Sequence, residues 1–179
     1  MTISTTPLEG LLIIKPQVFK DDRGYFLESY NQEKMKDQIK DNFVQDNESC
    51  SQKGVLRGLH FQKYPYSQAK LIRVIQGAIL DVVVDLRKDS KTYGEHFKIE
   101  LNGDNKQQLY IPKGFAHGFV TLKDNTIINY KCSEFYEPKS EVSILWNDQT
   151  LQIDWPVIHP ILSNKDINGL PFDTFMSPF

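Results

Sequence analysis

Short runs of alternating hydrophobic and polar residues recur along this chain. Phe97, Ile99 and Leu101 alternate with charged residues before an Asn-Gly-Asp-Asn turn, and a similar alternation runs through residues 81–87 and 142–146. A period of two is typical of a strand that buries one face and exposes the other. These segments therefore predict antiparallel β-strands.

Helical periodicity is scarce in comparison. Met35 and Ile39 lie one turn apart in residues 31–40, which are the best helical candidate, and we expect one further short helix in the C-terminal tail. Many short strands without intervening helices favour a sandwich, barrel or jelly roll over a parallel α/β sheet. No repeat or linker divides the sequence, so we expect residues 1–179 to form a single all-β domain.

Composition and charge narrow the functional classes. The 179 residues are 40% hydrophobic, which is enough for a substantial core and excludes a wholly disordered or coiled-coil chain. Because 21 Lys and Arg are balanced by 23 Asp and Glu, we expect no broad basic surface for nucleic acid. Cys50 and Cys132 are too few for a disulfide framework, and no signal peptide or membrane span is visible. We expect a cytoplasmic protein that does not bind membranes.

Two histidines lie in unusual sequence contexts. His60 follows Arg57 and Gly58, and it shares a strand face with Gln62 unless a bulge intervenes. A bulge at Gly58 would also bring Arg57 to the site. His117 ends a Pro-Lys-Gly-Phe-Ala-His turn, whose spacing resembles the second motif of the cupin jelly roll. The structural alternative for His60 is a hydrogen-bonded core histidine.

A metal site is the first functional alternative. A divalent metal needs three or four inward-facing ligands, which cupins generally supply with an HxH pair, a carboxylate and a later histidine. The chain has His60-Phe61-Gln62 in place of the HxH pair, so His60, Gln62 and His117 are the only candidate set. This set would fit a metal-dependent cupin oxygenase.

Three further polar residues lie beside or within predicted strands or near the C-terminus. Tyr130 shares a strand face with Cys132, Lys70 precedes an apolar strand, and Asp166 follows Leu-Ser-Asn-Lys. Taken singly, they read as a core tyrosine, a solvated strand end and a turn or cap residue.

Nine segments match a known pattern in their order and spacing, namely Phe19–Glu28, Phe43–Asn47, Val55–Gln62, Gln68–Leu71, Asp81–Arg87, Ile111–Phe119, Trp146–Asp148, Trp155–Pro156 and Leu162–Asp166. Together they resemble the dTDP-4-dehydrorhamnose 3,5-epimerase family, whose members are metal-independent cupins. The resemblance implies a cupin-type jelly roll with short peripheral helices.

The resemblance also implies catalytic roles. His60 corresponds to the general base, Asp166 to the carboxylate that orients it, and Tyr130 to the acid. Lys70 and His117 correspond to residues of the sugar pocket, and Lys70 would stabilise the enolate oxygen. The other positions that match substrate-binding residues are Arg23, Phe26, Glu28, Gln45, Asp46, Asn47, Arg57, Tyr136, Glu141 and Lys165.

The implied reaction inverts C3 and C5 of dTDP-4-dehydro-6-deoxy-D-glucose and gives dTDP-4-dehydro-L-rhamnose. The ketone at C4 acidifies both carbons, so we expect neither a metal nor a redox cofactor. The resemblance further implies a homodimer in which N-terminal strands are exchanged between subunits. Alternatives are a 3-epimerase that inverts C3 alone, the metal-dependent oxygenase and a sugar-binding jelly roll without catalysis.

Overall fold

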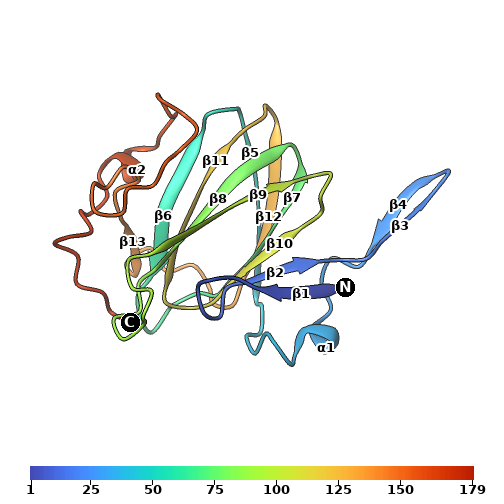
Figure 1. Cartoon of the computed structure of the whole chain (residues 1–179), viewed down its shortest axis with the longest axis horizontal. Coiled ribbons are helices and arrows are strands. Elements are labelled where there is room, and N and C mark those ends of the chain that lie inside the picture. The colour runs from blue at the N-terminus through green and yellow to red at the C-terminus, as the bar shows by residue number, and fades with distance from the viewer.

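The computed structural model describes residues 1–179 as two facing antiparallel β-sheets and a separate hairpin (Figure 1). The first sheet has six strands in the order β1-β2-β10-β7-β12-β5. In sequence order its strands are β1 (Thr2–Thr5), β2 (Leu12–Lys15), β5 (Gln45–Ser51), β7 (Lys70–Gln76), β10 (Gln108–Ile111) and β12 (Thr126–Cys132). This all-β architecture confirms the fold class predicted from the alternating pattern.

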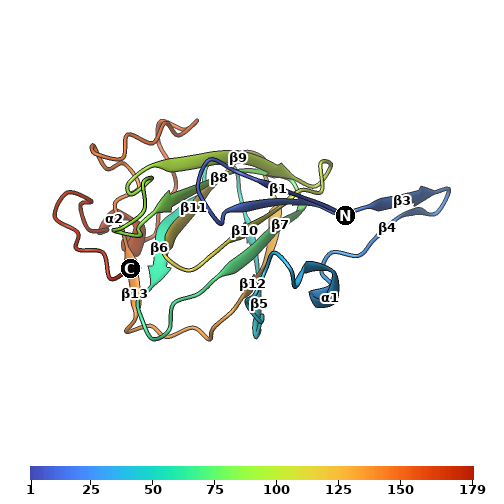
Figure 2. The same ribbon diagram turned by 60° about the horizontal axis from the view of Figure 1, so that its bottom comes forward.

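The second sheet has five strands in the order β13-β6-β11-β8-β9. Its strands are β6 (Leu56–Gln62), β8 (Ala78–Asp85), β9 (His96–Asn102), β11 (Phe115–Thr121) and β13 (Glu141–Ser143). The remaining two strands, β3 (Val18–Asp21) and β4 (Gly24–Leu27), form a hairpin that projects from the body of the molecule (Figures 1 and 2).

Three hydrophobic clusters hold the layers together. Ile72 and Val74 of β7 meet Val83 of β8 and Phe115 of β11 in a core between the two sheets. Burial of such side chains contributes about 1.5–3 kcal/mol each. The polar cavity described below therefore shares the space between the sheets with a large apolar core.

The outer faces of both sheets are also covered. Val82 and Val84 pack against Trp155 and Phe172 of the C-terminal segment, which lies over the five-stranded sheet. Because successive side chains of β8 alternate between this layer and the central core, nearly the whole strand is buried.

A second covering layer lies on the six-stranded sheet. Met35 and Ile39 pack on its outer face, but only α1 (Gln32–Met35) is helical, which is shorter than the predicted segment of residues 31–40. The C-terminal helix that we expected is α2 (Asn164–Ile167). No helix is long and apolar enough to cross a membrane.

One predicted strand is shorter than its pattern. Residues 142–146 alternate as a strand would, but β13 ends at Ser143. Ile144 still exchanges two backbone hydrogen bonds with Leu59 of β6, at 2.9 and 3.2 Å, and it forms an isolated bridge to Leu170. At Leu145 the partner is the C-terminal segment, since the Leu145 N–H donates to the Leu170 carbonyl at 3.0 Å.

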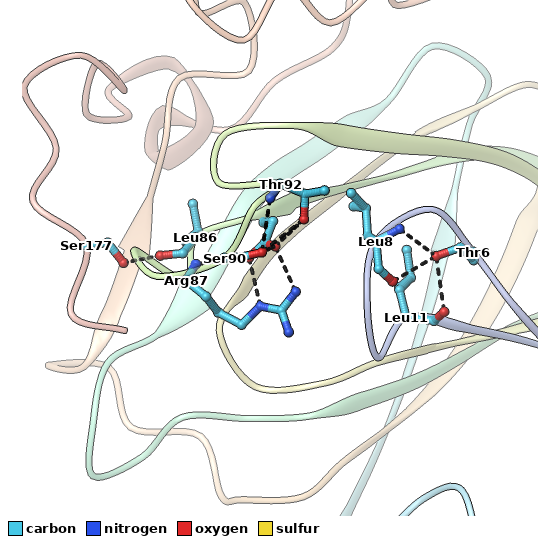
Figure 3. Close-up of polar contacts among 9 residues, drawn as sticks. Thr6, Leu8, Leu11, Leu86, Arg87, Ser90, Thr92 and Ser177 are labelled. Atoms are coloured by element: carbon cyan, nitrogen blue, oxygen red, sulfur yellow. Dashed lines mark hydrogen bonds and ion pairs between the residues drawn. The ribbon is translucent and has the colours of Figure 1, made fainter.

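Side-chain hydrogen bonds fix both ends of the chain (Figure 3). The Thr6 hydroxyl bridges the carbonyls of Leu8 and Leu11, each at 3.1 Å. Near the other end, the Ser177 hydroxyl donates to the Leu86 carbonyl. The C-terminal segment is thus anchored beside the end of β8.

Candidate active site

A cavity of about 410 Å³ lies between the two sheets and is lined mainly by polar side chains. Strands β5, β7 and β12 contribute from the six-stranded sheet, and β6, β11 and β13 from the five-stranded sheet. The lining residues are Gln45, Asn47, Ser49, Arg57, His60, Gln68, Lys70, His117, Phe119, Tyr130, Cys132, Tyr136, Glu141, Ser163, Lys165 and Asp166. Most residues singled out in the sequence are therefore brought together here.

Four of the predicted substrate-binding residues do not line the cavity. Asp46 lies on the opposite face of β5 from Gln45 and Asn47, and its carboxylate pairs with Lys131 at 2.9 Å. The alternation of side chains along a strand accounts for this placement. Arg23, Phe26 and Glu28 belong to or follow the projecting hairpin, outside this cavity.

A bulge in β6 explains how Arg57 and His60 reach the same cavity. The register pairs His117 with His60 but Phe119 with Arg57, so β6 contains one extra residue. Gly58 lies in this bulge at φ +137°, and a Cβ there would come within 2.4 Å of the Cα of Gly118. Only glycine fits this close approach of two backbones. Of the two alternatives that the sequence left open, a regular strand or a bulge at Gly58, the structure has the bulge.

Asp166 joins a helix terminus to the imidazole of His60. Its Oδ1 lies 2.7 Å from His60 Nε2 and accepts the Gly58 N–H at 3.0 Å. Its Oδ2 accepts from the Ser163 hydroxyl at 2.5 Å and from the Ser163 N–H at 3.2 Å. The Asp166 N–H donates in return to Ser163 Oγ at 3.3 Å, which completes a capping box for α2. The local sequence Ser-Asn-Lys-Asp thus builds the cap that delivers the carboxylate.

These contacts determine the charge of the pair. Burial alone would raise the pKa of Asp166, but hydrogen bonds from His60, Ser163 and Gly58 outweigh it and hold that pKa well below its usual range. Burial lowers the pKa of His60, and the hydrogen bond to Asp166 only partly opposes this shift. At neutral pH the pair is therefore an ionised carboxylate and an uncharged imidazole that can accept a proton.

Tyr130 and Lys70 come from the sheet that faces His60. Both lie on neighbouring strands, Tyr130 on β12 and Lys70 on β7, whereas His60 lies on β6. Burial raises the pKa of Tyr130, so its hydroxyl keeps its proton at neutral pH. Burial lowers the pKa of Lys70, which has no carboxylate within ion-pair distance.

A second imidazole and carboxylate lie beside the first pair. His117 Nε2 is 2.9 Å from Oδ2 of Asp81, and Asp81 is fully buried on β8. The other oxygen of this carboxylate, Oδ1, has no hydrogen-bond partner. Asp81 was not predicted as a site residue, although an acidic side chain in the middle of a mostly apolar strand was a usable signal.

Glu141 of β13 joins Tyr136 and Lys165 of α2 in one polar network. Glu141 accepts from the Tyr136 hydroxyl at 2.7 Å and pairs with Lys165 at 2.7 Å. Burial would raise the pKa of Glu141, but the hydrogen bonds from Lys165 and Tyr136 lower it on balance. Arg57 makes no ion pair and donates only to the Ser51 hydroxyl at 3.2 Å. Cationic groups are thus available to an anionic ligand.

The candidate metal ligands do not form a site. His60 and His117 are register partners, but Gln62 does not line the cavity, and its amide is hydrogen-bonded to backbone groups. No group of three or more His, Cys, Asp or Glu side chains is placed to hold a metal ion.

Some lining residues were not predicted as site residues. Ser49 lies on the same face of β5 as Gln45 and Asn47. Cys132 likewise shares a face of β12 with Tyr130, and Phe119 shares a face of β11 with His117. The period-two pattern could have found these three. Gln68 and Ser163 lie outside strands, so no such pattern applies to them.

Comparison with known proteins gives consistent matches over nearly the whole chain. The family model described as dTDP-4-dehydrorhamnose 3,5-epimerase matches residues 5–174. The dTDP-4-dehydrorhamnose 3,5-epimerase of Shigella flexneri is 49% identical over 174 residues, which cover 96% of each chain.

Solved structures agree with this result. The dTDP-4-dehydrorhamnose 3,5-epimerase from Elizabethkingia anophelis superposes with a TM-score of 0.92 at 48% identity, covering 97% of both chains. A dTDP-6-deoxy-D-glucose-3,5-epimerase from Legionella pneumophila, solved in complex with dTDP-4-keto-L-rhamnose, gives 0.94 at 44% identity and covers 98% of this chain and 94% of its own. This chain therefore belongs to the dTDP-4-dehydrorhamnose 3,5-epimerase family.

Proposed function

We propose that this protein inverts C3 and C5 of dTDP-4-dehydro-6-deoxy-D-glucose and releases dTDP-4-dehydro-L-rhamnose. The observation that carries the proposal is the placement of His60 and Tyr130 on opposite sheets around one cavity. Inversion of a carbon requires that a proton leaves one face of the sugar ring and another arrives on the opposite face. A base and an acid on facing sheets meet that requirement.

His60 is the base in this proposal. Because Asp166 is ionised, His60 Nε2 carries the proton that is donated to Oδ1 at 2.7 Å, and Nδ1 keeps the lone pair. Removal of the proton from C3 or C5 leaves an enolate that extends to the C4 oxygen. The imidazolium that forms is stabilised by the adjacent carboxylate of Asp166.

Tyr130 delivers a proton to the opposite face of the ring. Its raised pKa keeps the hydroxyl protonated until the enolate forms. Lys70, on the neighbouring strand, supplies a positive charge to the enolate oxygen. A single preorganised interaction of this kind is typically worth about 2.7–4 kcal/mol in the transition state.

The nucleotide would occupy the rest of the cavity. Arg57, without an ion-pair partner, suits the pyrophosphate through charge-assisted hydrogen bonds. Gln45 and Asn47 on β5 offer amide groups, and the exposed ring of Tyr136 offers a surface on which the base can stack. Lys165 would hydrogen-bond the substrate, as would Glu141, which also accepts from the Tyr136 hydroxyl.

We further propose a homodimer in which the β3–β4 hairpin reaches the cavity of the partner. The hairpin exposes Phe19 by 55%, Tyr25 by 57% and Phe26 by 68%, which is unusual for large apolar side chains on a projecting ribbon. Arg23 lies in its turn and pairs only with the exposed Asp21. The hairpin would thereby bring Arg23, Phe26 and Glu28 to a second site.

A cytoplasmic location completes the proposal. Cys50 and Cys132 are both unpaired thiols, which are typical of a reducing compartment.

The test is solvent exchange during turnover. The protein is incubated with dTDP-4-dehydro-6-deoxy-D-glucose in deuterium oxide, and both ring carbons are followed by NMR. We expect deuterium at C3 and C5 and formation of the L-rhamno product. His60→Asn should abolish exchange at both carbons while dTDP still binds.

Other results of these experiments would support one of the alternative functions. Exchange at C3 alone would indicate a 3-epimerase, and nucleotide binding without any exchange would indicate a binding protein. Stoichiometric iron, manganese, nickel or zinc in the purified protein, together with loss of activity on chelation, would support the oxygenase.

A further inference from the structure

Gln62 is a buried polar side chain that the proposed chemistry does not use. It lies two residues after His60 on β6, is only 4% exposed and does not line the cavity. Its amide is nevertheless fully engaged. Nε2 donates to the carbonyls of Tyr66 at 2.6 Å and Phe135 at 3.1 Å, and Oε1 accepts the Glu137 N–H at 2.8 Å.

Two of these three bonds flank Tyr136. In extended backbone, the carbonyl before a residue and the N–H after it point to the same side of the chain. One amide can therefore bind the Phe135 carbonyl and the Glu137 N–H together, as the N–H and the C=O of one residue in a neighbouring parallel strand would. Gln62 thus takes the place of a neighbouring strand for a loop segment that has no regular secondary structure of its own.

A second glutamine holds the other side of the same residue. The N–H of Tyr136 donates to Oε1 of Gln45 at 3.1 Å, in the direction opposite to the bonds made by Gln62. Gln68 adds a bond from Nε2 to the Glu134 carbonyl at 2.8 Å. The backbone around Tyr136 is therefore fixed by side chains from β5, from β6 and from the segment before β7.

The side chain of Tyr136 has few contacts of its own. It is 53% exposed, and its hydroxyl donates to Glu141 at 2.7 Å. With so little packing around the ring, its position depends on the backbone that carries it. A ring held in this way is ready to stack on a flat ligand group without first being ordered.

We propose that Gln62 is a positioning residue that holds Tyr136 in place to stack on the base of the nucleotide. This inference rests on the proposed binding of a dTDP-sugar. Gln62 touches no substrate and no reacting atom, so it acts on affinity through Tyr136. Without its three hydrogen bonds, the loop would lose order, and binding would have to restore that order.

A double-mutant cycle tests the coupling directly. Gln62→Met, Tyr136→Ala and the double variant are compared by the dissociation constant of dTDP, measured by isothermal titration calorimetry. Loss of a base stack is expected to raise Kd about tenfold for Tyr136→Ala, and Gln62→Met should produce a similar rise. If Gln62 acts through Tyr136, the double variant binds no more weakly than Tyr136→Ala alone.

A kinetic measurement separates positioning from a general loss of structure. Gln62→Met should raise KM for the dTDP-sugar and leave kcat within about twofold, because His60 and Tyr130 stay in place. Gln76→Met is the matched control. Its amide holds the Asn125 carbonyl at 3.2 Å, at the other end of β7 from Lys70, so its dTDP affinity should equal that of the unaltered protein.

Several results would overturn the inference. Additive effects in the cycle, or a Gln62→Met variant that loses thermal stability but binds dTDP normally, would make Gln62 a purely structural residue. If Gln62→Met does not fold, Gln62→Glu replaces it, since it keeps the acceptor for Glu137 but loses both donors. Failure of both variants to fold would also contradict the inference. If the unaltered protein does not bind dTDP, the proposed function itself fails.

Discussion

Asp166 shows how one residue serves both local structure and chemistry. Oδ2 takes part in the capping box with Ser163, and Oδ1 is hydrogen-bonded to His60 Nε2 and to the Gly58 N–H. The cap fixes the carboxylate before any ligand arrives. A short peripheral helix of four residues therefore has a role in the site that its length does not indicate.

At this scale we expect Asp166→Asn to lower kcat by about 10²–10⁴-fold. The neutral amide cannot stabilise the imidazolium, and it no longer favours the tautomer with the proton on Nε2. Steady-state kinetics on the dTDP-sugar measure the effect. Asp148→Asn is the control, because this buried carboxylate accepts three backbone N–H groups of Thr150, Leu151 and Phe172 away from the cavity.

The control should lose stability and keep kcat. Loss of one charged acceptor for backbone N–H groups costs about 1–3 kcal/mol in the free energy of unfolding. An Asp166→Asn enzyme with normal kcat would remove the carboxylate from the reaction.

The pH dependence follows from the direction of the His60 pKa shift. Burial lowers this pKa below the ordinary value of about 6.5, and the base acts only when uncharged. We therefore expect kcat/KM to stay constant as the pH falls through 6.5 and to decline only at lower pH. Initial rates between pH 5 and 8 measure the midpoint, and a midpoint above 6.5 would contradict a buried, uncharged base.

At the level of elements, the bulge in β6 is the local irregularity that builds the site. Arg57 and His60 are three residues apart, so a regular strand would place them on opposite faces. The extra residue in β6 rotates Arg57 to the side of His60, and the close pairing of Gly58 with Gly118 makes the bulge possible.

We expect Gly58→Ala to destabilise the fold strongly. A Cβ would meet the Gly118 backbone at 2.4 Å, and the φ of +137° adds strain. Together these cost about 2–5 kcal/mol in the free energy of unfolding, measured by urea denaturation. Gly54→Ala is the matched control, since its φ is +83° but nothing lies within 4 Å of the added Cβ, so only about 1–2 kcal/mol is expected. Equal losses in the two variants would contradict this account.

At the scale of the whole molecule, the layers pack together around shared sheets, whereas the β3–β4 hairpin projects from them. The central core and the two covering clusters share the same two sheets, and we propose that residues 1–179 fold as one domain. The β3–β4 hairpin is outside all three clusters. Its exposed apolar residues and Arg23 suit a neighbouring subunit better than solvent.

Subunit complementation tests this arrangement. Arg23→Ala and His60→Asn should each be impaired, and light scattering should give twice the chain mass of 20.8 kDa for both. When the two variants are mixed and allowed to exchange subunits, each mixed dimer gains one site with an intact His60 and an Arg23 from the other chain. About a quarter of the normal activity should then return. No recovery in verified mixed dimers would show that Arg23 does not serve the partner.

The sequence by itself determined the strand-rich architecture and the identity of the polar residues that gather in the cavity. Period-two alternation predicts strands because it reports local burial, and the motifs around His60, His117 and Asp166 are continuous in the chain.

Only the tertiary structure decided which groups meet. Because side chains alternate along β5, Asp46 points away from the cavity and pairs with Lys131. The bulge in β6 places Arg57 in the cavity, and Asp81 of β8 is hydrogen-bonded to His117. The lengths of α1 and β13 were also decided by packing and hydrogen bonding with distant segments. Contacts such as that between Gln62 and the loop around Tyr136 join residues more than seventy positions apart, so no local pattern can encode them.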